Sequence, residues 1–95
     1  MTENKYEIKK SSRFKKDYKR IKKRGYDLKL LATAINILAR GETLPEEYND
    51  HALIGDMSGF RECHIAPDWL LIYKMNDSIL VLTLTRTGTH SDLLE

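Results

Sequence analysis

The sequence is poor in cysteine and has no long apolar run. Its only cysteine, Cys63, cannot form an internal disulfide, and one thiol offers no metal-ligand spacing such as CxxC. A reducing compartment is therefore expected. The first ten residues, MTENKYEIKK, lack the apolar core of a secretory signal, and no stretch of about 18 apolar residues occurs. We expect a cytoplasmic protein without a membrane span.

Proline is scarce as well, with only Pro45 and Pro67. Pro45 lies in the polar stretch ETLPEEYNDH, residues 42–51, which is typical of a connecting loop within a domain. The 95 residues suffice for one core without disulfides and are too few for two. We therefore expect a single domain over residues 1–95, without repeats.

Charge is abundant and unevenly distributed. Residues 1–24 carry eleven Lys and Arg against three acidic residues, a net charge of +8, whereas residues 25–95 carry five against eleven, a net charge of −6. A strongly basic segment favours binding to a polyanion, and nucleic acid is the commonest one in the cytoplasm. The alternative is a helix face that is merely solvated.

The period of the apolar residues predicts a strand and then a helix in the first third of the chain. Residues 5–9 alternate between apolar and polar, as in a short half-buried strand. A helix is expected over residues 12–24, with Phe14, Tyr18 and Ile21 forming its apolar stripe at i, i+4 and i+7. The glycine that follows is expected to end this helix.

A second helix is predicted from its N-cap Asp27 to Gly41. It is expected to be mostly buried through one apolar face. That face comprises Leu28, Leu31, Ala32, Ile35 and Leu38.

Three strands are predicted in the last third of the chain, over residues 60–66, 69–75 and 78–86. The middle run, WLLIYKM, is apolar on both faces, as expected of a central strand. The order of elements is then β-α-α-β-β-β. We expect an α+β fold with the two helices packed on a small antiparallel sheet. The tail after Gly88 is long enough for only one helical turn against the sheet.

Hairpin geometry predicts which polar residues meet, because residue numbers that lie opposite each other in an antiparallel pair have a constant sum. A two-residue turn at residues 76–77 places Asp68 opposite Thr85 and Arg86 opposite Pro67. Asp68 and Arg86 are therefore expected at the same end of the sheet.

The preceding hairpin adds histidines to this end. A turn at residues 67–68 places His64 opposite Leu71, and His90 can fold back over the sheet edge. A slip of one residue would turn His64 to the other face. The expected cluster contains one acid, one arginine and two histidines, whereas hairpin geometry does not place His51.

Two segments carry a family resemblance. NDHALIGDMSGFRECHIAPDWLLIYK, residues 49–74, and TRTGTH, residues 85–90, resemble the YafQ-like toxins of the RelE/ParE superfamily. The family pattern is a DH near a Gly, then GxRxxHxxPDWxLIY, then RTGTH. The resemblance implies a β-α-α-β-β-β toxin fold and a ribosome-dependent endoribonuclease that cuts mRNA in the ribosomal A site. It also implies an antitoxin, encoded beside the toxin, that inhibits it.

The resemblance implies a catalytic set, carried over position by position. His51 is the histidine of the DH, His64 is that of RxxHxxPDW, Asp68 and Trp69 are the acid and aromatic of PDW, and Arg86 and His90 belong to RTGTH. The family often has a phenylalanine just before the C-terminus. This chain has Leu93 and Leu94 there, so no aromatic ring is available for base stacking at that place.

These residue types suit cleavage of RNA without a metal. The 2′-hydroxyl attacks the adjacent phosphate while one group takes a proton and another protonates the leaving 5′-oxygen. Histidine, with an ordinary pKa of about 6.5, serves in either role, and arginine stabilises the developing charge. We expect Arg86 to hold the phosphate, His90 and His64 to form the acid–base pair, and His51 to be a third candidate. Asp68 is expected either to orient or charge a histidine or to transfer a proton itself.

Two further expectations concern RNA binding. Trp69 is predicted either to stack on a base or, as is commoner in a central strand, to belong to the core. The lysines of the first helix are expected to bind ribosomal RNA phosphates, to be covered by an acidic antitoxin segment, or both. They are Lys15, Lys16, Lys19, Lys22 and Lys23.

Other functions remain as alternatives. ParE-like relatives of the fold poison DNA gyrase by binding and generally lack the histidine set, and a plain nucleic-acid-binding module leaves HIAPDW and RTGTH unexplained. The histidines are separated by 13 and 26 residues, which matches no short zinc motif, so no metal or other cofactor is expected. The expected partners are the antitoxin, the ribosome and mRNA. Operator DNA binding, alone or with the antitoxin, stays open, and the free protein is expected to be a monomer.

Overall fold

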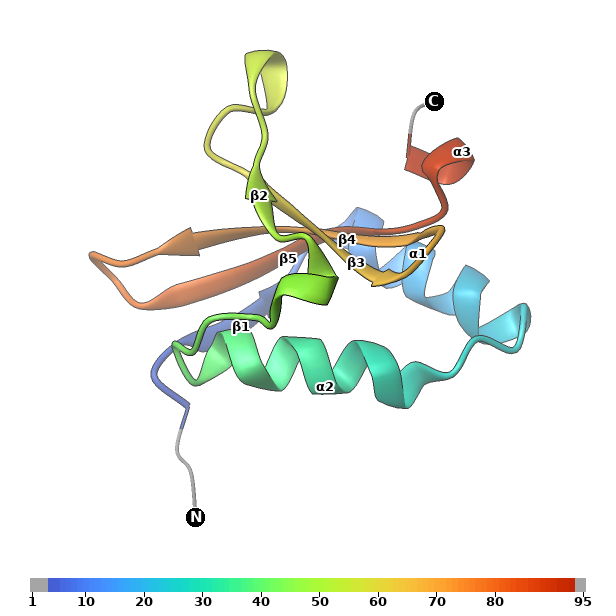
Figure 1. Ribbon diagram of the computed structural model, residues 1–95, viewed down its shortest axis with the longest axis horizontal. Helices are drawn as coiled ribbons and strands as arrows, with labels where there is room; N and C mark the ends of the chain where they lie inside the picture. Colours follow the sequence, from blue (N-terminus) through green and yellow to red (C-terminus); the bar gives the residue numbers. More distant parts are fainter. Residues whose placement is uncertain (1–3, 94–95) are drawn as a thin grey trace.

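A five-stranded mixed sheet is the frame of the structure, a computed structural model that describes residues 4–93 (Figure 1). The strands lie in the order β1-β5-β4-β3-β2. Their bounds are β1 (Glu7–Lys10), β2 (His51–Ala52), β3 (Arg61–Ala66), β4 (Trp69–Asn76) and β5 (Val81–Gly88). The central position of β4 confirms the prediction from its apolar sequence, and β2 is an additional short strand.

The sheet is not wholly antiparallel. β1 runs parallel to β5, whereas the other neighbouring strands are antiparallel. The connection explains this direction. After β1 the chain forms the two long helices and then enters the sheet at the opposite edge, with β2. The strands β2 to β5 then follow one another across the sheet, and only the last of them, β5, lies beside β1. The α+β class is confirmed, with a mixed sheet in place of the antiparallel one that we expected.

Both long helices begin where the sequence predicted. In α1 (Ser12–Lys23) the Ser11 hydroxyl accepts from the Phe14 amide at 2.9 Å, and in α2 (Leu28–Ala39) the Asp27 carboxylate accepts from the Lys29 amide at 3.1 Å. The remaining helical elements are short: η1 (Glu46–Tyr48), η2 (Gly55–Met57) and α3 (His90–Leu93). None of the helices within residues 4–93 is long and apolar enough to cross a membrane.

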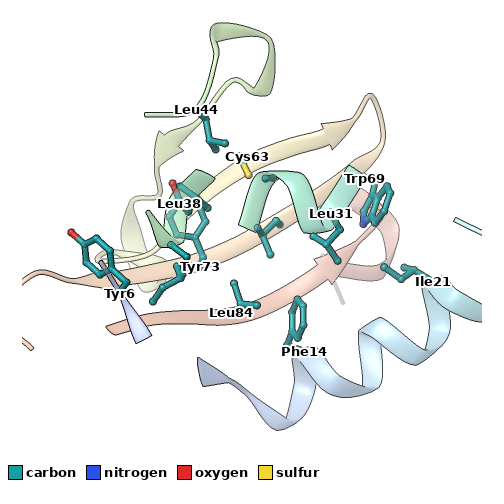
Figure 2. Close-up of a cluster of buried hydrophobic side chains, with 14 residues drawn as sticks. Tyr6, Phe14, Ile21, Leu31, Leu38, Leu44, Cys63, Trp69, Tyr73 and Leu84 are labelled. Atoms are coloured by element: carbon teal, nitrogen blue, oxygen red, sulfur yellow. The ribbon is translucent and has the colours of Figure 1, made fainter. Parts of the chain in front are cut away.

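The core lies between the two long helices and one face of the sheet (Figure 2). Leu71 and Tyr73 of β4 pack there against Phe14 of α1 and Leu31 of α2, all with almost no exposed surface. Cys63 is fully buried in the same layer, and this burial raises the pKa of its thiol to about 12. Cys63 is therefore a packing residue.

The apolar stripe of α1 differs from the prediction. Phe14 and Ile21 are buried as expected, but the third buried position is Asp17, and Tyr18 is 36% exposed. Asp17 is buried because its carboxylate accepts hydrogen bonds from β5. A polar contact with the sheet therefore decides how α1 is rotated.

α2 is less buried than predicted. Leu31 and Leu38 face the core, joined by Ala34 and Ala39, whereas Ala32 is exposed and Leu30 is 45% exposed. A groove between α1 and α2 explains the difference, because Ala32 lines it.

The hairpin between β4 and β5 has a longer turn than predicted. Asn76 lies opposite Val81, so four residues, 77–80, form the turn. The Asn76 side chain accepts from the amides of Ser78 and Ile79, which stabilises this turn. Arg86 consequently lies opposite Ile72. The expected pairings of Arg86 with Pro67 and of Asp68 with Thr85 were therefore wrong.

Irregular pairing also changes the other register. His64 lies opposite Leu70, one residue from the predicted Leu71, and a shift follows between His64 and Ala66. A second shift in β5 leaves Thr85 unpaired between Leu84 and Arg86. Such bulges redirect the side chains beside them. The two bulges lie next to His64 and Arg86, both of which the sequence indicated as site residues.

The two faces of the sheet carry different structures. α2 lies along one face, while the loop that contains η2 and the C-terminal α3 both project from the other (Figure 1). The second face is therefore not covered by a long helix, and the polar candidate residues gather on it.

Candidate active site

A cavity of about 610 Å³ occupies the face of the sheet opposite α2. Its polar lining comes from β3, β5, α1 and α3: Glu62, Arg86, Arg13 and His90. Its apolar lining includes Met57, Phe60, Leu70 and Ile72. Two guanidinium groups and an imidazole beside an apolar wall suit a phosphate-bearing ligand.

His90 and Asp68 form a directly bonded pair at the edge of this cavity. His90 Nδ1 lies 2.6 Å from Asp68 Oδ1, and the His90 backbone N–H donates to the same oxygen at 3.1 Å. These hydrogen bonds from His90 lower the pKa of Asp68. Because a carboxylate only accepts, Nδ1 carries the proton, and Nε2 remains available to exchange one.

His64 lies beside this pair. The ring centres of His64 and His90 are 5.9 Å apart, so the two imidazoles meet although the register differs from the prediction. The one-residue shift did not remove His64 from the cluster. His64 lines a separate hollow of about 370 Å³, together with Tyr48 and Pro67, and not the cavity that His90 lines.

Arg86 is held from one side and open on the other. Its Nε and Nη2 donate to the Asp17 carboxylate at 2.7 and 3.2 Å, and this hydrogen-bonded pair raises the pKa of Arg86. The Arg86 side chain is 13% exposed and lines the cavity that also contains His90. The structure therefore brings Arg86 and His90 to one cavity, and Asp68 is bonded to His90.

His51 lies in β2, directly opposite Glu62 of β3. Its Nε2 is 3.4 Å from Glu62 Oε1, and its Nδ1 is 2.7 Å from the Asn49 carbonyl oxygen. The preceding Asp50 accepts from the Tyr73 hydroxyl at 2.6 Å, which fastens this segment to the core. Glu62, which His51 contacts, also lines the cavity. Among the described residues, the recorded ring contact between histidines is that of His64 with His90.

The short helix α3 is fastened by ion pairs that the sequence did not suggest. Asp92 accepts from Arg24 at 2.7 and 3.1 Å and lies 3.4 Å from Arg20, while its Oδ2 also accepts from the Thr89 amide. Hydrogen bonds, from Arg24 above all, lower the pKa of Asp92 well below its usual range. Gly88 is required here, because a Cβ at this residue would lie 2.8 Å from the Asp92 carboxylate. These contacts hold His90 in place.

Sequence reasoning also missed three residues around the cavity: Asp17, Glu62 and Arg13. Asp17 had a signal in the sequence, as the single acidic residue of a basic helix, at a position next to the predicted stripe. Glu62 has a strand position on the same face as His64, two residues away, which alternation alone indicates.

Trp69 belongs to the core and not to an RNA-binding surface. It is 4% exposed and lies among the buried side chains of the core (Figure 2). Its ring meets that of Tyr26 edge-on at 5.0 Å, and its Nε1 donates to the Thr87 hydroxyl at 2.9 Å. Because both ring faces are covered, the alternative of base stacking was wrong.

The lysines of α1 are all exposed. Two of them, Lys15 and Lys19, border a groove of about 500 Å³ between α1 and α2, whose apolar lining includes Tyr18, Leu28 and Ile35. The full set is Lys15, Lys16, Lys19, Lys22 and Lys23. The basic helix therefore has an apolar surface beside it.

Leu93 lines the cavity beside His90, and Leu94 lies outside the described residues. Within residues 4–93, no three or more His, Cys, Asp or Glu side chains are arranged to hold a metal ion.

Comparison with known proteins places this chain in a family. A family model described as the bacterial toxin YafQ of type II toxin–antitoxin systems matches residues 6–95. The mRNA interferase toxin YafQ of Escherichia coli K12 is 40% identical over 88 residues, which cover 92% of this chain and 94% of that protein.

Solved structures agree with this match. The crystal structure of YafQ from E. coli BL21(DE3) has a TM-score of 0.88 at 37% identity, covering 95% of this chain and 99% of the other. YafQ in the E. coli DinJ–YafQ toxin–antitoxin complex has a TM-score of 0.87 at 38% identity, covering 96% and 99%. The chain therefore belongs to the YafQ family of toxins from bacterial type II toxin–antitoxin systems.

Proposed function

We propose that this toxin is an endoribonuclease that cuts mRNA in the ribosomal A site and thereby inhibits translation. The observation that carries the proposal is that His90, bonded to Asp68, lines the same cavity as Arg86. A relative named as an mRNA interferase, 40% identical over most of the chain, supports RNA as the substrate. The family match also favours a nuclease over a gyrase poison.

The chemistry begins with proton transfer at His90. Asp68 holds Nδ1 as the N–H tautomer, so the lone pair of Nε2 can take the proton of the attacking 2′-hydroxyl, or Nε2–H can protonate the leaving 5′-oxygen. When His90 becomes cationic, the neighbouring carboxylate stabilises the charge. Asp68 is therefore proposed to orient and charge His90.

A second imidazole is needed on the other reacting oxygen, and His64 is proposed for this role. A ring-centre separation of 5.9 Å lets one imidazole reach the attacking 2′-hydroxyl and the other the leaving 5′-oxygen of the same phosphodiester. His51, beside Glu62 and farther along the same sheet face, remains the third candidate. The pH dependence of the cleavage rate in histidine variants distinguishes the general acid from the general base.

Arg86 is proposed to bind the scissile phosphate. The phosphate gains negative charge in the transition state, and a fixed guanidinium stabilises that charge without moving. The apolar wall formed by Phe60, Leu70 and Ile72 reduces competition from water, which strengthens this interaction. The mechanism needs no metal ion, because proton transfer and charge stabilisation come from side chains.

The proposed partner in inhibition is a cognate antitoxin, as in the DinJ–YafQ complex of E. coli. Its acidic segment is proposed to lie on the groove between α1 and α2, because Lys15 and Lys19 border an apolar lining there. Replacing both Lys15 and Lys19 by glutamate should weaken antitoxin binding in calorimetry; unchanged affinity would exclude the groove as the binding site.

Operator DNA is proposed to bind only to the toxin–antitoxin complex.

The decisive experiment is primer extension on a defined mRNA translated in vitro. Wild-type toxin is compared with His90→Ala, with ribosomes present or omitted, and a transition-metal chelator that leaves ribosomal Mg²⁺ bound is added in a further arm. We expect cuts that need both ribosomes and His90 and that persist in chelator. A positioned acid–base group contributes about 10² to 10⁴ in rate, so the variant should lose at least that lower factor.

Circular dichroism of His90→Ala provides the control for folding. A folded wild-type protein that makes no cuts would contradict the nuclease and favour gyrase poisoning. Cuts without ribosomes would contradict only the part of the proposal that places cleavage in the A site. Loss of cutting in chelator would contradict the metal-independent mechanism.

A further inference from the structure

The helix α1 contains a buried carboxylate that the mechanism above does not use. Asp17 is 2% exposed, although it lies in a helix whose other charged residues are basic. Burying a charge costs free energy unless the group is paired and hydrogen-bonded. The bonds that Asp17 makes therefore show what stabilises its charge there.

Asp17 bonds both to the backbone of β5 and to Arg86. β1 ends opposite Leu84, so the next part of β5 has no neighbouring strand on that side, and Asp17 Oδ2 accepts the Thr87 backbone N–H at 3.2 Å in its place. The same oxygen accepts Arg86 Nε at 2.7 Å, and Oδ1 accepts Nη2 at 3.2 Å. One carboxylate thus fixes the strand and the guanidinium relative to each other.

This pairing leaves one nitrogen of Arg86 for a ligand. Nε and Nη2 are engaged by Asp17, and no partner for Nη1 occurs among the described residues. Within residues 4–93 no buried side-chain nitrogen or oxygen lacks a hydrogen-bond partner, so Nη1 is not enclosed. Because Arg86 lines the cavity that contains His90, Nη1 is the group that a phosphate there can reach.

We propose that Asp17 is a positioning residue that holds Arg86 by Nε and Nη2 so that Nη1 binds the scissile phosphate beside His90. The inference rests on the proposed function, since it gives Arg86 a phosphate to bind. The bulge at Thr85 turns Arg86 toward the cavity, and Asp17 then limits its rotation. A guanidinium fixed in advance needs no reorganisation during the reaction.

The test is a double-mutant cycle on ribosome-dependent cleavage under single-turnover conditions. Asp17→Asn keeps the shape of the side chain and removes its charge, and it is made in the wild type and in Arg86→Lys. In the wild type we expect the maximal rate to fall about 10-fold or more, with a smaller change in half-saturation, because a transition-state contact is lost. In Arg86→Lys we expect Asp17→Asn to cause little further loss.

The matched control is Asp27→Asn, because Asp27 is an exposed N-cap and asparagine caps a helix equally well. It should leave cleavage unchanged. Equal loss from Asp17→Asn in both backgrounds would overturn the proposal and make Asp17 purely structural. A wild-type toxin that cuts RNA while Arg86→Lys has no effect would instead refute the assigned role of Arg86.

A second measurement uses the unaltered protein, so it does not depend on how well Asp17→Asn folds. The Nε–H proton of Arg86 is followed by ¹⁵N NMR as inorganic phosphate is added. We expect slow exchange of this proton with water both before and after phosphate addition, because Asp17 holds it throughout. Fast exchange in the free protein, or its onset with phosphate, would overturn the proposal.

Discussion

Tyr73→Phe tests the contact that fastens the His51 segment to the core. The Tyr73 side chain is 1% exposed, and its hydroxyl donates to Asp50 at 2.6 Å. Phenylalanine fills the same space, so the substitution removes a hydrogen bond without leaving a cavity. Asp50 keeps its contact with Arg61 at 3.3 Å.

The size of the effect follows from the type of bond. A hydrogen bond to a charged group contributes about 1.5–3 kcal/mol, and the remaining partner of Asp50 favours the lower end, about 1.5 kcal/mol. For a chain of this length each kcal/mol shifts Tm by about 4–8 °C. We expect Tyr73→Phe to unfold about 6–12 °C below the wild type at pH 7.

The difference should depend on pH in a defined direction. Burial, followed by the hydrogen bond to Asp50, raises the pKa of Tyr73 above that of an unfolded tyrosine, about 10. Below pH 10 both states keep the proton and the stabilisation is complete. As pH rises further, the unfolded state releases the proton first, so wild-type stability falls by about 1.4 kcal/mol per pH unit. Tyr73→Phe lacks this loss, and the two stabilities should meet near pH 11.

Urea unfolding followed by circular dichroism at pH 7, 9, 10 and 11 measures these differences. Other titrating groups, such as Cys63, are common to both proteins and cancel in the comparison. Tyr48→Phe is the matched control, because the Tyr48 hydroxyl donates to no side chain or carbonyl among the described residues. A stability difference that stays constant from pH 7 to 11 would refute the raised pKa, and no difference at pH 7 would refute the hydrogen bond.

Two further predictions concern the placement of His90. Asp68→Asn should lower cleavage about 10-fold or more and leave Tm nearly unchanged, because the exposed carboxylate orients an imidazole and adds little to stability; full activity in primer extension would exclude an orienting role. Asp92→Asn should release α3. The Leu93 amide, which donates to the Thr89 carbonyl at 3.2 Å in the unaltered protein, should then exchange faster with deuterium, and cleavage should fall. The lowered pKa of Asp92 means that its stabilisation is complete above the ordinary carboxyl pKa of about 4 and is lost as pH falls below it. Unchanged exchange at Leu93 would show that α3 is held by other contacts.

The local sequence determined most of the elements and the residue types of the site. The caps Ser11 and Asp27, the alternation in residues 5–9 and the apolar run of β4 each depend on neighbours a few residues away. The polar residues of HIAPDW and RTGTH were recognisable for the same reason, as short patterns with fixed spacing. This is why the α+β class and the histidine cluster were predictable.

Only the tertiary structure decided how these residues meet. The four-residue turn after Asn76 and the bulges beside His64 and Arg86 set the registers, and a bulge has no periodic pattern in the sequence. The bond between Asp17 and Arg86 joins residues 69 positions apart, so it requires α1 to lie along the uncovered part of β5. Burial of Trp69 likewise favoured the core over base stacking, two alternatives that the sequence left open. Composition and spacing thus determined which polar side chains the toxin has, whereas strand register, helix rotation and burial decided which of them reach the cavity, because those depend on contacts between distant parts of the chain.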